Sequence, residues 1–387
     1  MIINADLHIH SKYSGGTSER MDLETIAGES RRKGIELVGT GDCLHPLWLQ
    51  SIKRHRTERP VFVPTTEVED KDRVHHLLIF PSCSKAEEYR EAVRAHAPNI
   101  DTDGRPHIEW GGEAIAQAAK DCEALIGPAH AFTPWTALYA YHDSLSSCYG
   151  DLTDYVTFLE LGLSADTDYA DRIAALRSLA FLSNSDAHSP HPVRLAREFN
   201  RFDLRDTDFD SLKEAITKGG VTLNVGLPPA EGKYNESTCI RCLQHYPLAE
   251  CERLRWRCPC GGRIKKGVKD RVEELADYAK PHHPPNRPPY LHMIPLAEII
   301  ALALGRSSPY TKSVIAQWHE LIQSFGSETT ILIDAPLEEI ERRTVEAVGS
   351  AIGAFRRGDI IVHPGGGGVY GKLELPGGGR QSTLGDF

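Results

Sequence analysis

The stretch Ile2-Ile-Asn-Ala-Asp6-Leu-His8-Ile-His10 joins an apolar, β-like run to two histidines that stand two residues apart. Residues two apart on an extended strand point to the same face, so His8 and His10 can bind one ion together. Neutral imidazoles and carboxylates that converge at strand ends are typical of a metal centre in an α/β barrel. The stretch therefore predicts a strand whose end carries metal ligands.

Three further clusters of His, Asp and Glu also stand next to β-like runs. They are Glu67 with His75, Pro128-Ala-His130 and Asp186-Ala-His188, beside the runs 61–63, 124–126 and 181–183. One such cluster is more often a pair of polar surface residues, but four at predicted strand ends are hard to reach by chance. We interpret them as a multi-metal site in a metallohydrolase. Either His75 or His76 is a possible ligand, because strand alternation sends only one of two neighbours inward.

Composition places the chain among soluble globular proteins. It has 387 residues, 40% hydrophobic and 25% charged, with a net charge of −10, which suits two or three domains and a large core. We expect no secretory signal and no membrane span, since neither a leader pattern nor an apolar run of about 20 residues is present. Nine cysteines, five of them clustered between Cys239 and Cys260, favour metal thiolates in a reducing, cytoplasmic setting.

The order of the predicted elements indicates an α/β fold. Apolar runs alternate with amphipathic stretches up to about residue 228, which predicts βα units and a mainly parallel sheet. The expected helices of this domain include 22–33, 84–96, 112–122 and 168–178. The turn-rich stretch Gly226–Lys233 marks its end.

We expect three further parts after this first domain, 1–228. They are a small zinc-binding module at 234–271, a mainly helical domain at 272–364 and an irregular glycine-rich tail at 365–387. The helical domain is predicted to hold helices at 271–280, 295–304, 310–325 and 336–356, with a short strand at Thr330–Ile333.

Two cysteine pairs in the second part are typical of a structural metal site. Cys239-Ile-Arg-Cys242 and Cys258-Pro-Cys260-Gly-Gly supply four thiolates, with 16 residues from the first pair to the second, and they suit one tetrahedral zinc ion. Unrelated buried cysteines are the alternative, and we expect Cys251 to be a bystander. Basic residues cluster on the same module, so we expect Arg263, Lys265 and Lys266 to contact a DNA backbone.

A group of aromatic residues follows His130. Its members are Phe132, Trp135, Tyr139, Tyr141 and Tyr149. Most aromatic side chains pack in a core, and the alternative is a surface that stacks on nucleotides beside the metals. Trp135 is the candidate DNA contact among them.

Taken in order, the clusters resemble the PHP (polymerase and histidinol phosphatase) family of phosphoesterases over roughly residues 1–225. The motifs that carry the resemblance are Asp6-Leu-His8-Ile-His10-Ser, Thr40-Gly-Asp42, Thr66-Glu67, Val74-His75, Ala129-His130 and Asn184-Ser-Asp186-Ala-His188. The resemblance implies a distorted (β/α)7 barrel that holds two or three divalent ions, Zn²⁺, Mg²⁺ or Mn²⁺. Such ions bridge phosphate oxygens and lower the pKa of a bound water.

The same resemblance implies a role for each ligand. One ion would be held by His8, His10, Glu67 and Asp186; Glu67 would bridge to a second ion held by His75 and His130; His188 and Asp42 would hold a third. Gly16 stands where the family often has another histidine, which predicts a weaker or exchangeable third ion. Catalysis is expected to depend on Glu67, His130 and Asp186.

Nearly the whole chain resembles one subfamily of DNA repair enzymes, endonuclease Q. The resemblance rests on the barrel motifs, the cysteine module, Glu160–Asp166 and Arg287-Pro-Pro-Tyr290-Leu-His. It implies a metal-dependent endodeoxyribonuclease that cuts DNA 5′ of deaminated bases (uracil, hypoxanthine, xanthine) and of abasic sites. The damaged base would be flipped into a pocket beside the metals, with Ser164 as a candidate wall.

Two other functions stay open at this point. One is a small-molecule PHP phosphatase, for instance an enzyme like histidinol phosphatase. The other is a non-catalytic scaffold that binds zinc, DNA and a sliding clamp. The barrel alone would serve the first, whereas a scaffold has no use for converging imidazoles.

The stretch Gln381-Ser-Thr-Leu384-Gly-Asp-Phe387 resembles the peptide by which replication and repair proteins dock onto the sliding clamp PCNA. On one helical turn Leu384 and Phe387 lie on the same face and can fill an apolar pocket. Gln381 would add a polar contact. The stretch therefore predicts PCNA as a partner.

Overall fold

The computed structural model describes residues 1–376, and these divide into two compact units. Unit 1 holds Met1–Gly162, Ala175–Val225 and Pro284–Tyr290, and unit 2 holds Leu163–Ala174, Gly226–His283 and the chain from Leu291 onward. The predicted first domain, 1–228, thus corresponds mainly to unit 1. Within residues 1–376 no helix has both the length and the apolar character that crossing a bilayer requires.

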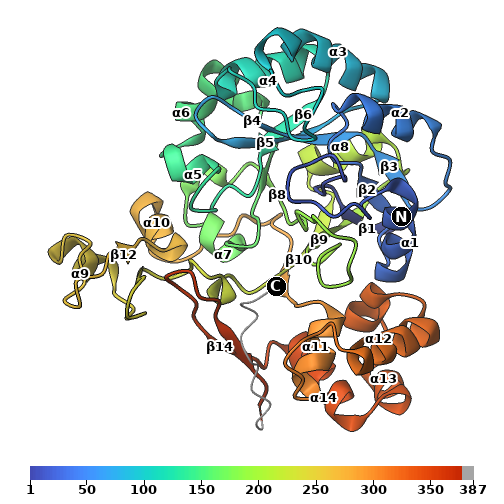
Figure 1. The fold of residues 1–387 in the computed structure, drawn as a ribbon, viewed down its shortest axis with the longest axis vertical. Coiled ribbons are helices and arrows are strands. Elements are labelled where there is room, and N and C mark those ends of the chain that lie inside the picture. The colour runs from blue at the N-terminus through green and yellow to red at the C-terminus, as the bar shows by residue number, and fades with distance from the viewer. Residues whose placement is uncertain (377–387) are drawn as a thin grey trace. The chain divides into compact units, whose positions relative to one another are not determined.

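Along the chain, helices separate most of the barrel strands (Figure 1). The strands are β1 (Ile2–Asp6), β2 (Leu37–Gly39), β3 (Val61–Val63), β4 (Thr65–Glu69), β5 (His75–Ile79), β6 (Leu125–Pro128), β7 (Phe158–Glu160), β8 (Ala180–Leu182), β9 (Phe199–Asp203) and β10 (Val221–Gly226). The helices are α1 (Leu23–Lys33), α2 (Pro46–Arg54), α3 (Cys83–Val93), α4 (Gly112–Asp121), α5 (Leu138–Tyr141), α6 (Leu145–Tyr149) and α8 (Phe209–Lys218). The exceptions to this alternation are β3, β4 and β5, which follow one another directly, as do β8 and β9.

The strands form a closed but irregular circuit. One sheet has six strands and includes the run β10-β9-β1-β2-β3, a second has the order β4-β5-β6, and a third has β7-β8. Strand β6 packs on β7, and Ile9, just beyond β1, bridges to Ala187, just beyond β8. This arrangement confirms the predicted α/β fold with a distorted barrel, whose interior is filled by an apolar cluster that includes Ile3, Leu37 and Phe158.

The sheets are less parallel than predicted. Strands β1, β2 and β3 pair in parallel, as do β7 and β8. However, β4, β5 and β6 pair antiparallel, and β9 is antiparallel to both β1 and β10. The reason for β4 and β5 is local: Asp70 Oδ1 accepts the N–H groups of Asp72 and Val74, and this side-chain turn joins the two strands as a hairpin, which makes them antiparallel.

The remaining elements are short in the cysteine module and longer in the helical domain. They are α7 (Thr167–Ala170), β11 (Thr238–Cys239), α9 (Leu248–Arg253), β12 (Ile264–Lys265), α10 (Val268–Leu275), β13 (Tyr290–His292), α11 (Leu296–Ala303), α12 (Lys312–Phe325), α13 (Leu337–Arg343), α14 (Glu346–Arg357), β14 (Ile361–His363) and β15 (Lys372–Glu374). The predicted helix 168–178 is reduced to α7 and a 3-10 turn at Ala174–Leu176.

The prediction of a strand at Thr330–Ile333 is wrong. The segment forms a π-helical turn, Thr330–Asp334, because Arg356 donates to the carbonyls of Ile331, Leu332 and Ala335 in place of a strand partner. A short apolar run does not distinguish strand from buried helix by its pattern alone. The predicted helix 336–356 is likewise two helices, α13 and α14, since Thr344 adopts an extended conformation between them.

The predicted irregular tail begins with a loop at 365–371, but Lys372–Glu374 form the strand β15. Strands β14 and β15 pair as an antiparallel hairpin, and glycines of its loop lie against other parts of unit 2. Gly365 N–H donates to the carbonyl of Ala230, and a Cβ on Gly366 would lie 2.0 Å from Thr238 Oγ1. Residues 377–387, which include the predicted clamp peptide, lie outside the described residues.

Candidate metal centre

The predicted ligands of the barrel come together at the ends of β1, β4, β5, β6 and β8. Three overlapping groups could each hold an ion, and within each group the ligand atoms lie within 4.8 Å of one another. The groups are His8, His10 and Glu67; His10, Asp186 and His188; and Glu67, His75 and His130. Since His10 and Glu67 each belong to two groups, the arrangement is one connected centre.

Glu67 lies in the middle of this centre. Its Oε1 is 2.7 Å from His75 Nδ1 and 2.8 Å from His130 Nε2, whereas its Oε2 is 3.4 Å from His10 Nε2. Burial raises the pKa of Glu67, but the charge of His75 and the close approach of His10 and His130 outweigh burial and hold that pKa well below its usual value. The ionised carboxylate therefore presents one oxygen to each of two histidine sets.

Asp186 completes the side of the centre nearest to His10. Its Oδ1 is 3.2 Å from His10 Nε2 and 3.8 Å from His8 Nε2. The His188 ring lies beside it, with its centroid 4.4 Å from that of His10. Asp186 has a φ of 47° and His130 a φ of 30°. Positive φ is unusual for such residues and is a form of strain found at functional sites.

The donor atoms fit a set of metal ions. His8 Nε2 and His10 Nε2 are buried and have no hydrogen-bond partner among residues 1–376, although a buried unsatisfied nitrogen costs about 1–3 kcal/mol. Both nitrogens face carboxylate oxygens at distances that a shared ion would span. Imidazole with carboxylate suits Zn²⁺ and Mn²⁺, and carboxylate oxygen also suits Mg²⁺.

Carboxylates behind the histidines hold each ring in place. His8 Nδ1 is 2.9 Å from Glu160 Oε2, His10 Nδ1 is 3.0 Å from Asp42 Oδ1, and His75 Nε2 is 3.0 Å from Glu69 Oε2. Each contact uses the ring nitrogen that faces away from the centre. Such contacts fix the tautomer of a metal-binding histidine and increase its basicity.

The structure places Asp42 behind His10 and does not bring it together with His188. Its Oδ1 contacts His10, and its Oδ2 accepts hydrogen bonds from the N–H of Ser11 at 2.6 Å and from the hydroxyls of Ser11 and Ser14 at 2.7 and 2.9 Å. All of these contacts orient Asp42 as a support for His10. Its role as a ligand of a third ion stays a prediction.

Between the two adjacent histidines of β5, the geometry selects His75. His76 points to the opposite side of the strand, where its Nδ1 is 2.7 Å from the Tyr149 hydroxyl and its Nε2 is 3.3 Å from Asp70 Oδ2. Cys148 lies beside them, and the atoms of Asp70, His76 and Cys148 are close enough to form a group. Because both nitrogens of His76 already have partners, we interpret this group as structural.

Sequence reasoning missed Glu160, Glu69 and Arg105 as members of the centre. Glu160 accepts hydrogen bonds from the N–H of His130 and from Asn184 Nδ2 as well as from His8. An acid at the end of the apolar run Phe158-Leu-Glu160 was a usable signal. Arg105 Nη1 lies 3.1 Å from Glu67 Oε2, and it comes from a loop that carries no motif.

Other predicted site residues lie elsewhere in their units. Trp135 is 36% exposed, whereas Phe132, Tyr139 and Tyr149 are buried, so most of the aromatic group is core. Ser164 is half-buried and belongs to unit 2, in the segment between β7 and α7.

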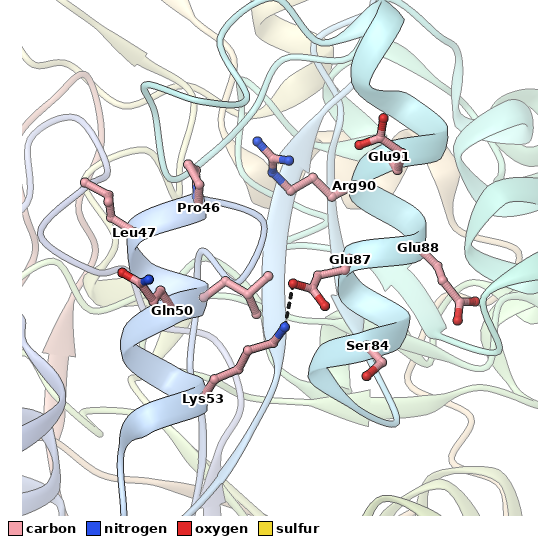
Figure 2. Close-up of a pocket in the computed structure, with 10 residues that line it drawn as sticks. Pro46, Leu47, Gln50, Lys53, Ser84, Glu87, Glu88, Arg90 and Glu91 are labelled. Atoms are coloured by element: carbon pink, nitrogen blue, oxygen red, sulfur yellow. Dashed lines mark ion pairs between the residues drawn. The ribbon is translucent and has the colours of Figure 1, made fainter.

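A separate hollow of about 840 Å³ lies between α2 and α3 (Figure 2). Lys53 and Glu87 form an ion pair there at 2.5 Å. Pro46, Leu49 and Arg90 are among its other lining residues. None of the predicted metal ligands lines this hollow.

The four cysteines of the predicted zinc site also come together. Cys239 Sγ is 3.5 Å from Cys260 Sγ, and Cys242 Sγ is 3.6 Å from Cys258 Sγ. The paired strands β11 and β12 and the N–H of Gly262, which donates to Cys260 Sγ, shape the site. A Cβ on Gly262 would lie 2.6 Å from Cys239 Sγ, so glycine is required there. The set suits one structural zinc ion.

Cys251 is not a member of the four-cysteine group, although it packs in a small apolar cluster with Cys239, Cys258 and Ile264. The three basic residues predicted to contact DNA differ in their surroundings. Arg263 is exposed. Lys265 Nζ lies 4.2 Å from the Tyr234 ring centroid, and Lys266 forms an ion pair with Glu274.

Comparison with known proteins identifies the family. The chain is similar to the lesion-specific endonuclease PfuEndoQ from Pyrococcus furiosus, whose crystal structure has 48% sequence identity to it. The match covers 97% of this chain and 96% of PfuEndoQ, with a TM-score of 0.93. The chain belongs to the endonuclease Q family, a family of metal-dependent DNA endonucleases. A crystal structure of endonuclease Q in complex with a 27-mer duplex substrate, with an abasic lesion at the active site, is 47% identical, with 99% of each chain covered and a TM-score of 0.90.

Curated relatives include two proteins described as uncharacterized. MJ0043 of Methanocaldococcus jannaschii is 47% identical over 250 residues, which are 63% of this chain and 31% of MJ0043. YqxK of Bacillus subtilis is 29% identical over 406 residues, 96% of this chain and 99% of YqxK. The chain thus spans about a third of the length of the first relative and nearly all of the second. The family model for the MJ0043 C-terminal domain matches residues 295–359, which contain α11 to α14.

Replacing Glu160 by Gln should weaken metal binding. The amide keeps the size of the side chain but lacks the charge that orients His8, and loss of such a contact typically costs 10–100-fold in metal affinity. Metal titration monitored by calorimetry would measure the change. Glu36→Gln is the control, because Glu36 accepts the N–H of Asn4 on β1, the strand that precedes His8. Equal affinity of Glu160→Gln and wild type would contradict the assignment.

Replacing Cys239 and Cys242 together by Ser should release one tightly bound ion per chain, which we expect to be zinc, and should unfold residues 238–265 locally. Metal analysis and limited proteolysis would detect the two effects. Cys251→Ser should keep the ion, since Cys251 lies outside the four-cysteine group. If the double variant retains the full zinc content, the site does not exist as described.

Proposed function

We propose that this chain cleaves the phosphodiester bond 5′ of deaminated bases (uracil, hypoxanthine and xanthine) and of abasic sites in DNA. The observation that carries the proposal is its match, over 99% of each chain, to an endonuclease Q with an abasic duplex at the active site. The connected ligand groups of the barrel support it. A small-molecule phosphatase would need the barrel alone, whereas the likeness includes the cysteine module and the helical domain.

We assign one ion to His8, His10, Glu67 and Asp186, and a second to Glu67, His75 and His130. His188 is the candidate ligand of a third. Divalent ions in such a site polarise a phosphoryl oxygen and lower the pKa of a bound water. The protein's part is to orient the histidines, through Glu160, Asp42 and Glu69, and to exclude bulk water from the buried Glu67.

Recognition of the lesion would require the base to leave the duplex. A flipped base can be tested by hydrogen bonds to its exposed edge, where a deaminated base carries a carbonyl and a ring N–H in place of an amino group. We propose Ser164 and its neighbouring backbone as one wall of the pocket. Arg263 and the half-buried Lys265 and Lys266 would contact the DNA backbone.

The direct test is cleavage of a labelled duplex with one uracil, hypoxanthine or abasic site, in Mg²⁺, Mn²⁺ or Zn²⁺. Wild type should give a single cut 5′ of the lesion. Glu67→Gln should lose at least 10³-fold in rate, because the shared carboxylate orders both ions. Glu113→Gln is a control, since Glu113 lies on α4, accepts the N–H of Asp151 and is not a predicted metal ligand. Equal cutting of damaged and undamaged duplexes would contradict the proposal.

We also propose docking onto a sliding clamp of the PCNA type through Gln381, Leu384 and Phe387. Burial of two apolar anchors contributes about 2–4 kcal/mol, so Leu384→Ala with Phe387→Ala should abolish a micromolar interaction. Co-purification with the host's clamp measures binding, and cleavage of a short oligonucleotide without clamp should stay unchanged. Equal retention of wild type and the double Ala variant by the clamp, or retention of neither, would refute the docking.

A further inference from the structure

The loop between α3 and α4 carries Arg105 to the metal centre. Arg105 Nη1 lies 3.1 Å from Glu67 Oε2, the same oxygen that is 3.4 Å from His10 Nε2. The Glu67 side chain is fully buried, whereas 32% of the Arg105 side chain is exposed. The guanidinium therefore lies at the border between the buried centre and solvent, where a substrate can reach it.

The loop is held firmly against the wall of the centre. Gly104 N–H donates to the carbonyl of Tyr13 at 3.0 Å, and Arg105 N–H donates to Asp103 Oδ1 at 3.0 Å. On the other side of Arg105, the Glu69 N–H donates to the carbonyl of Pro106 at 3.0 Å. These contacts fix the backbone on both sides of Arg105.

Close packing under the loop confirms how near it runs to the ligands. A Cβ on Gly104 would lie 2.5 Å from both Asp42 Oδ2 and Ser14 Oγ, and Asp42 supports His10. Only glycine fits at this contact. The position of Arg105 is thus set before any substrate arrives, and preorganised donors contribute most to transition-state stabilisation.

A purely structural role explains this arrangement poorly. Without ions, Arg105 compensates the charge of Glu67. With two divalent ions on Glu67, that charge is already compensated, and a cation a few ångströms from the ions is repelled. An anion that lies between the guanidinium and the ions removes this repulsion. A phosphodiester is such an anion, and the planar guanidinium matches phosphate oxygens in two parallel hydrogen bonds.

We propose that Arg105 binds a non-bridging oxygen of the scissile phosphate and stabilises the charge that develops on it. This inference rests on the proposed endonuclease function. In the hydrolysis, the oxygen of water bonds to phosphorus, the bond from phosphorus to the leaving oxygen breaks, and the leaving oxygen gains a proton. Arg105 gives up no proton and stays charged throughout, so it acts by position and charge alone.

The variants Arg105→Gln and Arg105→Lys test the proposal, with Arg94→Gln as the matched control. Arg94 is a nearby arginine whose ion pair with Asp101 measures 2.9 Å. Removal of one preorganised donor typically costs 10²–10³-fold in kcat. We expect such a loss for Arg105→Gln, a recovery of about 10-fold in Arg105→Lys because the charge is kept, and wild-type kcat in Arg94→Gln.

Two readouts that do not depend on cleavage separate this role from structural support. Metal content should be the same in Arg105→Gln as in wild type. Calorimetric titration of the metal-loaded protein with inorganic phosphate should give a dissociation constant that is at least 10-fold higher in Arg105→Gln and unchanged in Arg94→Gln. Loss of metal in parallel with activity would make Arg105 a support for Glu67 and overturn the proposal.

Unchanged phosphate affinity in Arg105→Gln would also overturn the proposal, whatever its kcat. If wild type cuts no lesion-containing DNA, the proposed function fails, but the phosphate titration still decides whether Arg105 contacts a phosphate beside the metals. Equal phosphate binding by wild type and Arg105→Gln in that case would refute the inference as well.

Discussion

A fully buried carboxylate, that of Glu67, is the constraint on which the centre depends. A buried charge without a partner costs several kcal/mol, so the chain must surround Glu67 with positive or polarisable groups. It does so from several directions: His10 follows β1, His75 opens β5, His130 follows β6, and Arg105 comes from a loop. The side chains at these strand ends thus converge on one anion. Divalent ions would compensate the same charge more fully, which makes the metal-loaded form the one for which the site is built.

Three residues of the centre also carry backbone strain. Asp42, His130 and Asp186 all have positive φ, a conformation that costs of order 1–3 kcal/mol for each such residue. The strain is tolerated because each of these residues is held by neighbours: Ser11 donates to Asp42, Glu160 accepts the N–H of His130, and the carbonyl of His8 accepts the N–H of Asp186. The apolar cluster of the barrel lies beneath, and it keeps the strand ends from relaxing. Fixed ligand positions favour catalysis, since the donors need no rearrangement when charge develops.

The sequence predicted which His, Asp and Glu side chains come together better than it predicted their surroundings. His8, His10, Glu67 and the other candidate ligands could be found because residue type and strand alternation are local properties. Strand direction was harder, since the hairpin of β4 and β5 depends on one side-chain turn at Asp70. The supporting role of Asp42 and the contact of Arg105 with Glu67 depend on parts of the chain that are distant in sequence. The turn at Thr330–Asp334 was missed for the same reason, because Arg356 satisfies its carbonyls from α14.

The central claim is that Glu67 is shared between two metal ions, and electron paramagnetic resonance of the Mn²⁺-loaded protein tests it most directly. Two Mn²⁺ ions that share a carboxylate are close enough for their spins to couple, and the expected spectrum is the multiline signal of a coupled pair. Glu67→Gln should convert it into the six-line signal of isolated ions or remove bound Mn²⁺ altogether. A wild-type protein that binds two or more Mn²⁺ ions in the barrel and shows only the six-line signal would contradict the account.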